Sequence, residues 1–382
     1  MKKNLTVMLS LMLILSLLVG ACGTTAAQGG AQTGAGSAGT GGGGGAAEGA
    51  EPLKVAFLYD SPVGDGGWIS SHDLGREVVA AMPNVEVISA DNVPESDGWN
   101  YMNNFAQQGY DLVFACSFGY MQDCLDVASK NPDTAFMHCA GYMTSDNMGN
   151  YFGRNYEAAY LAGMACGGVT KSNIIGYVAP FPIAEVTRNI DAFALGVSKV
   201  NPAAKVQLVW ISAWYDPTLA SEAAETLISV GADALFHYEN SPAVVQTAAK
   251  HGVYACGQHS DASAFSPEYC LTSSVWDWGA LYSDVVRQVA DGVWEPEELW
   301  WGMAEGLVDI TELNPVIPED ARARIEATRA GLKSGDVTCN PFYGEVVDQA
   351  GVVRLPEGTD ASFDQLMGMD YLAQNVVGTL GT

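Results

Sequence analysis

Aromatic and polar side chains gather where the apolar segments of this sequence end. Tyr59 and Asp60 follow the first of these segments, and Phe118 and Tyr120 follow a later one. A flat ring offers two faces for stacking and an edge that carboxylate, amide and hydroxyl groups can hydrogen-bond. The pattern therefore predicts a binding site for a planar ligand such as a nucleobase. The candidate ligand-binding residues are Tyr59, Asp60, Trp68, His72, Phe118, Tyr120, Phe181, Trp214, Asp216, Asn240, Ser260, Asp261 and Trp276. Because large rings are also common in cores, the prediction rests on the set rather than on any one ring.

The stretch from Gly64 to Trp68 is rich in glycine, but it matches neither a phosphate-binding P-loop nor the order GxGxxG. It predicts a tight turn that presents Trp68 and then begins a helix capped by Ser70 or Ser71. His72 falls in the first turn of that helix, where hydrogen bonding to a ligand suits it better than acid–base catalysis.

Catalytic signatures are weak in this sequence. Asp60, Asp65 and Asp73 come nearest to a carboxylate cluster, and their spacing fits no catalytic pattern. A nucleoside-cleaving enzyme is therefore a weaker hypothesis than a binding protein. A sugar or a flavin-like molecule stays open as the ligand, because aromatic rings stack on those groups too. The sequence has no Cys-x-x-Cys pair and no zinc-type Cys/His spacing, so we predict neither a metal site nor a cofactor.

The elements that must position these residues alternate along the chain with a period of about 30 residues, as βαβ units do. Strands are predicted at 55–59, 85–89, 112–116, 135–139, 174–178, 206–211, 234–237, 253–256 and 271–275, and helices at 72–82, 99–108, 121–129, 157–167, 185–200, 217–230, 242–251, 280–290, 322–332 and 363–377. The pattern restarts after Tyr156, which predicts two α/β lobes with parallel sheets and a cleft between them. In such sheets ligands bind beyond the carboxyl ends of the strands, where the candidates lie.

The N-terminal segment reads as a signal and a tether. Lys2 and Lys3 precede an apolar run from Leu5 to Leu18, and small residues then lead to Cys22. This order is typical of bacterial lipoproteins, so we expect cleavage before Cys22 and a diacylglycerol on its thiol. The run is shorter than the roughly 20 residues of a membrane span. Residues 23–50 are nearly all Gly, Ala, Thr, Ser and Gln, which predicts a flexible linker. We therefore expect a protein outside the cytoplasm that contacts the membrane through its lipid anchor only.

The charge balance excludes some partners. The formal net charge is −27, although charged residues make up only 16% of the chain. So acidic a protein is not expected to bind nucleic acid or to adhere directly to anionic lipid.

Seven cysteines follow Cys22, and an exported protein meets oxidising conditions. We expect a disulfide between Cys256 and Cys270, which flank one loop, with Cys116 and Cys139 as the next candidate pair. The odd number leaves at least one thiol free in a monomer.

From Leu53 onward the sequence resembles the basic membrane protein (BMP) family of substrate-binding lipoproteins that serve ABC importers. The resemblance is carried by Gly66–Arg76, Ser117–Met121, Gly153–Gly163, Gly176–Val186, Trp214–Pro217 and Gly257–Asp261. It implies the two-lobed periplasmic-binding-protein fold of type I, with the ligand in the interlobe cleft. It also implies a monomer that binds a purine base or nucleoside and delivers it to an ABC permease and its ATPase.

The resemblance suggests boundaries and roles as well. It implies a signal peptide at 1–21, a lipidated cysteine and linker at 22–51, lobe 1 at 52–154 and 276–300, and lobe 2 at 155–275 and 301–382. Trp68 matches a position whose ring stacks on the base, and Asp261 falls in a loop that supplies polar contacts. Asn240 departs from the pattern, because the resemblance implies an aspartate in the loop before Ser241.

Overall fold

The computed structural model describes residues 51–381. The predicted signal peptide, Cys22 and the linker up to residue 50 lie outside these residues. Residues 51–381 belong to one compact unit. Within the described part of the chain, no helix is both long and apolar enough to cross a membrane.

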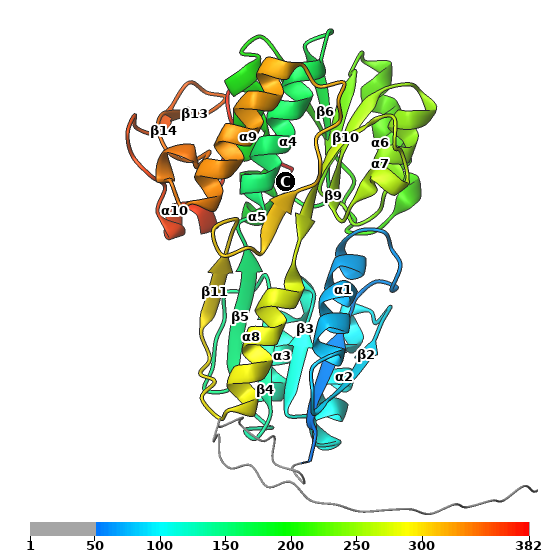
Figure 1. Cartoon of the computed structure of the whole chain (residues 1–382), viewed down its shortest axis with the longest axis vertical. Helices are drawn as coiled ribbons and strands as arrows, with labels where there is room; N and C mark the ends of the chain where they lie inside the picture. The colour runs from blue at the N-terminus through cyan, green and yellow to red at the C-terminus, as the bar shows by residue number, and fades with distance from the viewer. Residues whose placement is uncertain (1–50, 382) are drawn as a thin grey trace, which may run out of the picture. The chain divides into compact units, whose positions relative to one another are not determined.

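The first sheet has six parallel strands in the order β11-β5-β4-β3-β1-β2 (Figure 1). They are β1 (Leu53–Leu58), β2 (Val85–Ala90), β3 (Leu112–Ala115), β4 (Ala135–Cys139), β5 (Met148–Gly153) and β11 (Glu298–Trp301). Its helices are α1 (Trp68–Ala80), α2 (Gly98–Gln107), α3 (Met121–Ala128) and α8 (Trp278–Ala290). Val55 and Phe57 pack in the same cluster as residues of α1 and α8, whereas Ala56 and Leu58 pack with α2 and α3. Helices thus cover both faces of the sheet, which explains the unbroken apolar run of β1. We call this part lobe 1.

The second sheet has the order β12-β10-β9-β8-β6-β7-β15, in which β12 runs antiparallel to β10 and the other neighbours are parallel. Its strands are β6 (Ile174–Ala179), β7 (Lys205–Trp210), β8 (Ala234–His237), β9 (Tyr254–His259), β10 (Cys270–Trp276), β12 (Val308–Ile310) and β15 (Val376–Val377). The accompanying helices are α4 (Tyr156–Val169), α5 (Ala184–Val200), α6 (Pro217–Ser229), α7 (Ala243–Lys250), α9 (Glu319–Lys333) and α10 (Phe363–Met367). We call this part lobe 2.

Helices α4 and α5 cross closely because each contributes a glycine at the contact. A Cβ atom on Gly163 would overlap the carbonyl oxygen of Phe193, and one on Gly196 would overlap that of Tyr160. The two backbones therefore touch only because side chains are missing there.

The chain passes between the two sheets after β5, after β10 and between β11 and β12. Arg154 ties the first of these crossings to the third. Its Nε and Nη2 atoms lie 2.7 and 2.5 Å from carboxylate oxygens of Glu157 and Glu305, and Nη1 donates to the Trp300 carbonyl at 2.6 Å. A guanidinium with three charge-assisted or carbonyl contacts fixes the segment where the lobes join.

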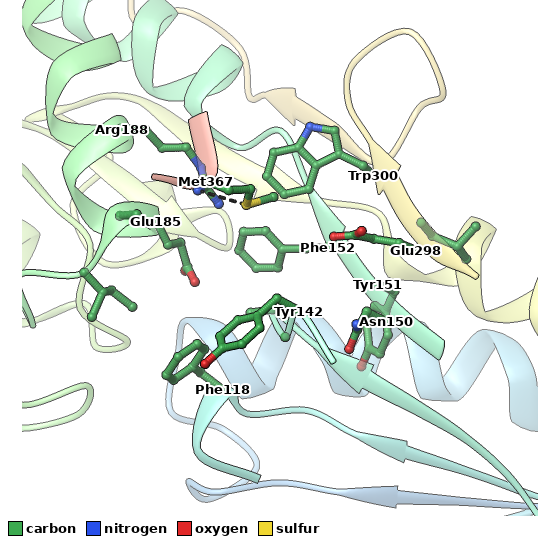
Figure 2. Close-up of a pocket in the computed structure, with 15 residues that line it drawn as sticks. Phe118, Tyr142, Asn150, Tyr151, Phe152, Glu185, Arg188, Glu298, Trp300 and Met367 are labelled. Carbon is green, nitrogen blue, oxygen red and sulfur yellow. Dashed lines mark hydrogen bonds between the residues drawn. The ribbon is translucent and has the colours of Figure 1, made fainter. Parts of the chain in front are cut away.

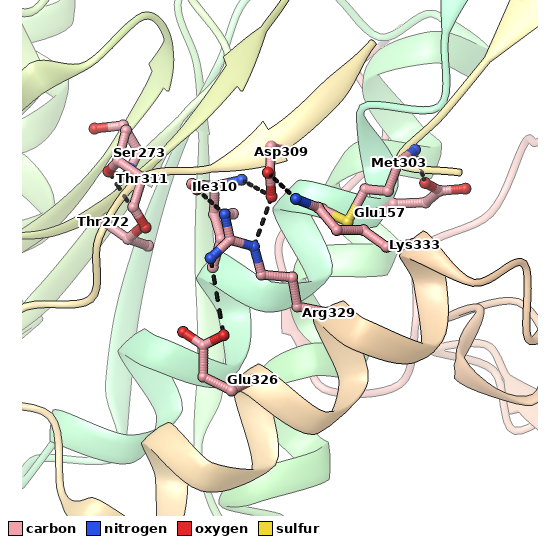
Figure 3. Close-up of polar contacts among 10 residues, drawn as sticks. All are labelled: Glu157, Thr272, Ser273, Met303, Asp309, Ile310, Thr311, Glu326, Arg329 and Lys333. Carbon is pink, nitrogen blue, oxygen red and sulfur yellow. Dashed lines mark hydrogen bonds and ion pairs between the residues drawn. The ribbon is translucent and has the colours of Figure 1, made fainter. Parts of the chain in front are cut away.

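The C-terminal part of the chain packs on lobe 2 (Figure 1). Helix α9 is tied to β12 by Asp309, which accepts from Arg329 Nε at 2.7 Å and lies 2.6 Å from Lys333 Nζ (Figure 3). Burial raises the pKa of Asp309, but the hydrogen bonds from these two cations lower it by more. The net shift of the pKa is therefore downward. A short hairpin of β13 (Val346–Val347) and β14 (Val353–Leu355) follows. The last strand, β15, pairs with β7 at the sheet edge.

The α/β class with parallel sheets is confirmed, and several predicted elements are corrected. Strand β5 was not predicted, because its sequence MGNYFG lacks the branched aliphatic residues that signal a strand. The helix predicted at 363–377 ends at Met367, since Gly368 stands at its C-cap and Val376–Val377 pair with β7 instead. Strand pairing in the folded protein has overridden a weak helical pattern.

The predicted disulfide between Cys256 and Cys270 is wrong, since both are free thiols, as are Cys116 and Cys139. In the β9–β10 register Cys270 lies opposite Ala255. Side chains alternate between the faces of a sheet, so Cys256 points to the other face, where its sulfur lies 3.6 Å from that of Cys166.

Candidate ligand-binding site

The turn before α1 is organised by Asp65 rather than by the predicted serine caps. The helix begins at Trp68, and the carboxylate of Asp65 accepts from the backbone N–H groups of Gly67, Ile69 and Ser70 at 2.8–2.9 Å. Three donors on one buried carboxylate hold this turn rigidly. The turn thereby fixes Trp68, whose indole N–H donates to the Cys116 carbonyl at 2.9 Å.

A narrow cavity, which we call the slot, lies where the carboxyl ends of strands from both sheets meet. It is lined by Asp60, Trp68, Ser117, Phe118, Ala140, Glu185, Trp214, Tyr238, Asn240 and His259. Its volume is about 30 Å³, enough for about two water molecules. A heterocycle therefore enters only when the lobes separate or the walls move.

Two carboxyl groups from opposite lobes face the slot in the same way. Asp60 accepts from the Ser117 hydroxyl at 2.8 Å through Oδ2, and its buried Oδ1 has no hydrogen-bond partner in residues 51–381. Glu185 accepts from the Tyr238 hydroxyl at 3.0 Å through Oε1. Burial raises the pKa of Asp60 to about 6 and also raises that of Glu185. Each carboxyl is thus held by one oxygen while the other is available to a ligand.

His259 supplies a donor to the same space. Its Nδ1 accepts from the indole N–H of Trp276 at 3.0 Å, and Nε2 is buried without a partner among the described residues. Because burial lowers the pKa of His259 to about 3, the ring is neutral and its proton sits on Nε2. The backbone of His259 has a φ of +70°, and Ala140 has a φ of +63°. Such left-handed backbone is uncommon outside glycine and concentrates at ligand sites.

The two lobes touch each other beside the slot. The Ser260 hydroxyl of lobe 2 donates to the Gly66 carbonyl of lobe 1 at 2.6 Å. A Cβ atom on Gly67 would overlap the carbonyl oxygen of Asn240, so only glycine permits this approach. The structure therefore has the lobes closed on each other at this edge.

A larger chamber of about 280 Å³ adjoins the slot and shares Phe118, Ala140 and Glu185 with it (Figure 2). Arg188, one helical turn beyond Glu185, stands over the Trp300 ring at 4.9 Å and donates to the Leu366 carbonyl at 3.2 Å. Burial lowers the pKa of this guanidinium. Arg188 thus connects the chamber wall to the C-terminal segment, and the chamber gives a slot ligand room to extend.

The predicted site residues fall into two groups. Asp60, Trp68, Phe118, Trp214 and Asn240 line the slot. The others are not among its lining residues: Tyr59, His72, Tyr120, Phe181, Asp216, Ser260, Asp261 and Trp276.

Members of the second group have supporting contacts instead. His72 is fully buried against Trp278 and hydrogen-bonds Tyr282, while Tyr120 donates to the Val93 carbonyl. Asp216 caps α6 through the backbone N–H groups of Thr218 and Leu219. Slot residues that were not predicted are Ser117, Ala140, Glu185, Tyr238 and His259. Ser117, Ala140 and Tyr238 follow strands and His259 ends β9, and that position at the carboxyl edge is a signal that would have found these four.

The buried carboxyl of Asp60 makes the stability of the ligand-free protein depend on pH. Its pKa is about 6 when folded and 3.8 in the unfolded chain, so the folded state binds the proton more tightly. The contribution of Asp60 to the free energy of unfolding therefore rises as the pH falls from about 6 to about 4. A shift of about two pKa units corresponds to roughly 3 kcal/mol. We expect Asp60→Asn to stabilise the protein by up to that amount at pH 7.5 and by little at pH 4, measured by urea unfolding. A difference that is the same at both pH values would contradict this assignment.

Comparison with known proteins identifies the class. The family model described as ABC transporter substrate-binding protein PnrA-like (Bmp) matches residues 53–334. A purine-binding protein of Brucella abortus is 39% identical over 334 residues, covering 87% of this chain and 95% of the relative. A Haloferax volcanii protein provisionally named as an ABC transporter glucose-binding protein is 40% identical over 299 residues. The match covers 77% of this chain and 76% of that relative.

Solved structures agree on the fold. The solute-binding protein of an ABC transporter system from Aeropyrum pernix matches with a TM-score of 0.66 at 19% identity, over 75% of this chain and 92% of that chain. A solute-binding protein of an ABC transporter system from Conexibacter woesei matches with a TM-score of 0.63 at 22% identity. This match covers 74% of this chain and 97% of that chain.

Two α/β lobes with a slot between them define the two-lobed periplasmic-binding-protein fold. This chain belongs to the Bmp, PnrA-like family of ABC transporter substrate-binding proteins, as the sequence resemblance implied. It is a non-enzymatic protein that binds a solute for an ABC transporter.

Proposed function

We propose that this protein captures a purine base or nucleoside outside the cytoplasm and delivers it to an ABC permease and its ATPase. In this proposal the lipid on Cys22 anchors it at the membrane, and residues 23–50 tether the binding unit. The purine-binding relative at 39% identity supports the ligand class.

The observation that carries the proposal is the set of free polar groups between aromatic walls. Trp68, Phe118 and Trp214 border the slot, and Asp60 Oδ1 and His259 Nε2 face it without partners in residues 51–381. A buried polar atom without a partner is costly, so a ligand with an N–H donor and a ring-nitrogen acceptor complements these groups. A purine has both on one rigid plane.

Aromatic stacking supplies the affinity in this account, and the polar edge supplies selectivity. Closure of the lobes removes water from the slot, where each unmatched polar group discriminates strongly between ligands. The closed, loaded form is the form that docks on the permease.

A sugar is the second candidate ligand, because the Haloferax volcanii relative at 40% identity is provisionally named for glucose binding. The slot favours a flat heterocycle over a hexose, since four of its ten lining residues are Trp, Phe or Tyr and the space between them is narrow.

The test is mass spectrometry of the small molecules released when the protein, purified without added ligand, is denatured. We expect a purine base or nucleoside in near-stoichiometric amount. Release of a hexose or a flavin in that amount, with no purine, would overturn the proposal.

A further inference from the structure

The two carboxyl groups of the slot form no ion pair in the described part of the chain, although the charge of Arg188, one helical turn beyond Glu185, opposes the effect of burial on the pKa of Glu185. Neither Asp60 nor Glu185 takes part in any of the ion pairs found among residues 51–381. Each is oriented by one hydroxyl, from Ser117 at 2.8 Å and from Tyr238 at 3.0 Å. Because the second oxygen of each fixed carboxyl group has no internal donor among the described residues, it is arranged for a donor that arrives with a ligand.

The two acceptors occupy different depths. Asp60 Oδ1 is fully buried at the end of β1 in lobe 1. Glu185 stands in lobe 2 at the boundary between the slot and the chamber, since it lines both (Figure 2). A ring N–H that points into the slot therefore meets Asp60, and a substituent that projects toward the chamber meets Glu185.

We propose that Asp60 and Glu185 together select an amino-substituted heterocycle, a 6-aminopurine rather than a 6-oxopurine. The inference rests on the proposed function and specifies its ligand. The exocyclic amino group donates to the free oxygen of Glu185, a ring N–H donates to Asp60, and a ring nitrogen accepts from His259. An oxo group in place of the amino group sets an oxygen against the Glu185 carboxylate, and both remain unpaired.

The proposal assigns the two carboxyl groups different effects on selectivity. Glu185→Gln keeps the size of the side chain and an oxygen for Tyr238, but adds an amide N–H that an oxo group can accept. Asp60→Asn alters a contact that both purines make. Only the first substitution should change the ratio of the two affinities.

The experiment is calorimetric titration of the ligand-stripped full chain with adenine and with hypoxanthine. We expect adenine to bind roughly tenfold or more tightly, Glu185→Gln to reduce or reverse that ratio, and Asp60→Asn to weaken both purines while keeping it. Glu222→Gln is the matched control, because Glu222 is exposed on α6 and lines neither the slot nor the chamber, and it should leave both affinities unchanged.

The outcomes separate this inference from the proposed function. If both purines bind equally, or if Glu185→Gln leaves the ratio unchanged, the selection rule is overturned while purine binding stands. If neither base binds, this inference fails, and titration with adenosine and inosine then tests the proposed function, which fails if neither nucleoside binds.

Discussion

Replacing Gly67 by alanine should weaken ligand binding about tenfold to a hundredfold without unfolding either lobe. Gly67 belongs to lobe 1, and a Cβ atom there would overlap the carbonyl oxygen of Asn240 in lobe 2. Relieving an overlap of one methyl group costs about 1–3 kcal/mol, and each 1.4 kcal/mol is a factor of about ten in affinity. Because the clash exists only when the lobes meet, it opposes closure rather than folding. Calorimetry gives the affinity, and the melting temperature of the ligand-free protein checks the fold.

The control for this substitution comes from the same turn. A Cβ atom on Gly64 meets nothing within 4 Å, although its φ of +91° means that alanine strains the turn itself. Gly64→Ala should therefore change the affinity much less than Gly67→Ala. Equal losses in the two variants would show that the turn, and not contact between the lobes, is responsible.

Replacing Trp68 by alanine should remove much of the affinity and part of the stability. The indole lines the slot, lies edge-on to His72, Trp276 and Trp278 at 4.2–5.7 Å, and is only 8% exposed. Stacking on a base contributes about 1–3 kcal/mol, and truncating a buried Trp to Ala costs about 3–5 kcal/mol of stability. We expect an affinity loss of at least about tenfold, measured by calorimetry at a temperature where circular dichroism shows the variant folded.

Trp68→Phe separates stacking from hydrogen bonding at this position. It keeps an aromatic face but leaves the Cys116 carbonyl without its indole donor. A net hydrogen bond contributes about 1 kcal/mol, so stability should fall modestly while most of the affinity remains. If Trp68→Ala binds as tightly as the unaltered protein, Trp68 has no stacking role.

The sequence supports the fold prediction because the apolar runs of β1, β3 and β4 are buried on both faces and alternate with amphipathic helices. Strand β5 was not predicted because Gly149, Asn150 and Gly153 are residues that are depleted in strands. The disulfide prediction failed because closeness along a loop says nothing about the sheet face to which each thiol points. The register of strand pairing decides which face of the sheet each side chain points to, and the sequence alone does not give that register.

The slot could be predicted in part for a similar reason. Asp60, Phe118 and Asn240 lie two or three residues after the ends of strands, so their place at the carboxyl edge can be predicted from the sequence. Glu185 could not be found in this way, because an acidic residue in the first turn of a helix has an ordinary role with the helix dipole. Its position opposite Asp60 depends on how the two lobes meet.

The most direct test of the central claim is a crystal structure of the protein with adenine. The account predicts the base in the slot against Trp68, with a ring N–H at Asp60 Oδ1 and a ring nitrogen at His259 Nε2. Adenine bound elsewhere, including wholly within the chamber beside Arg188, would contradict it.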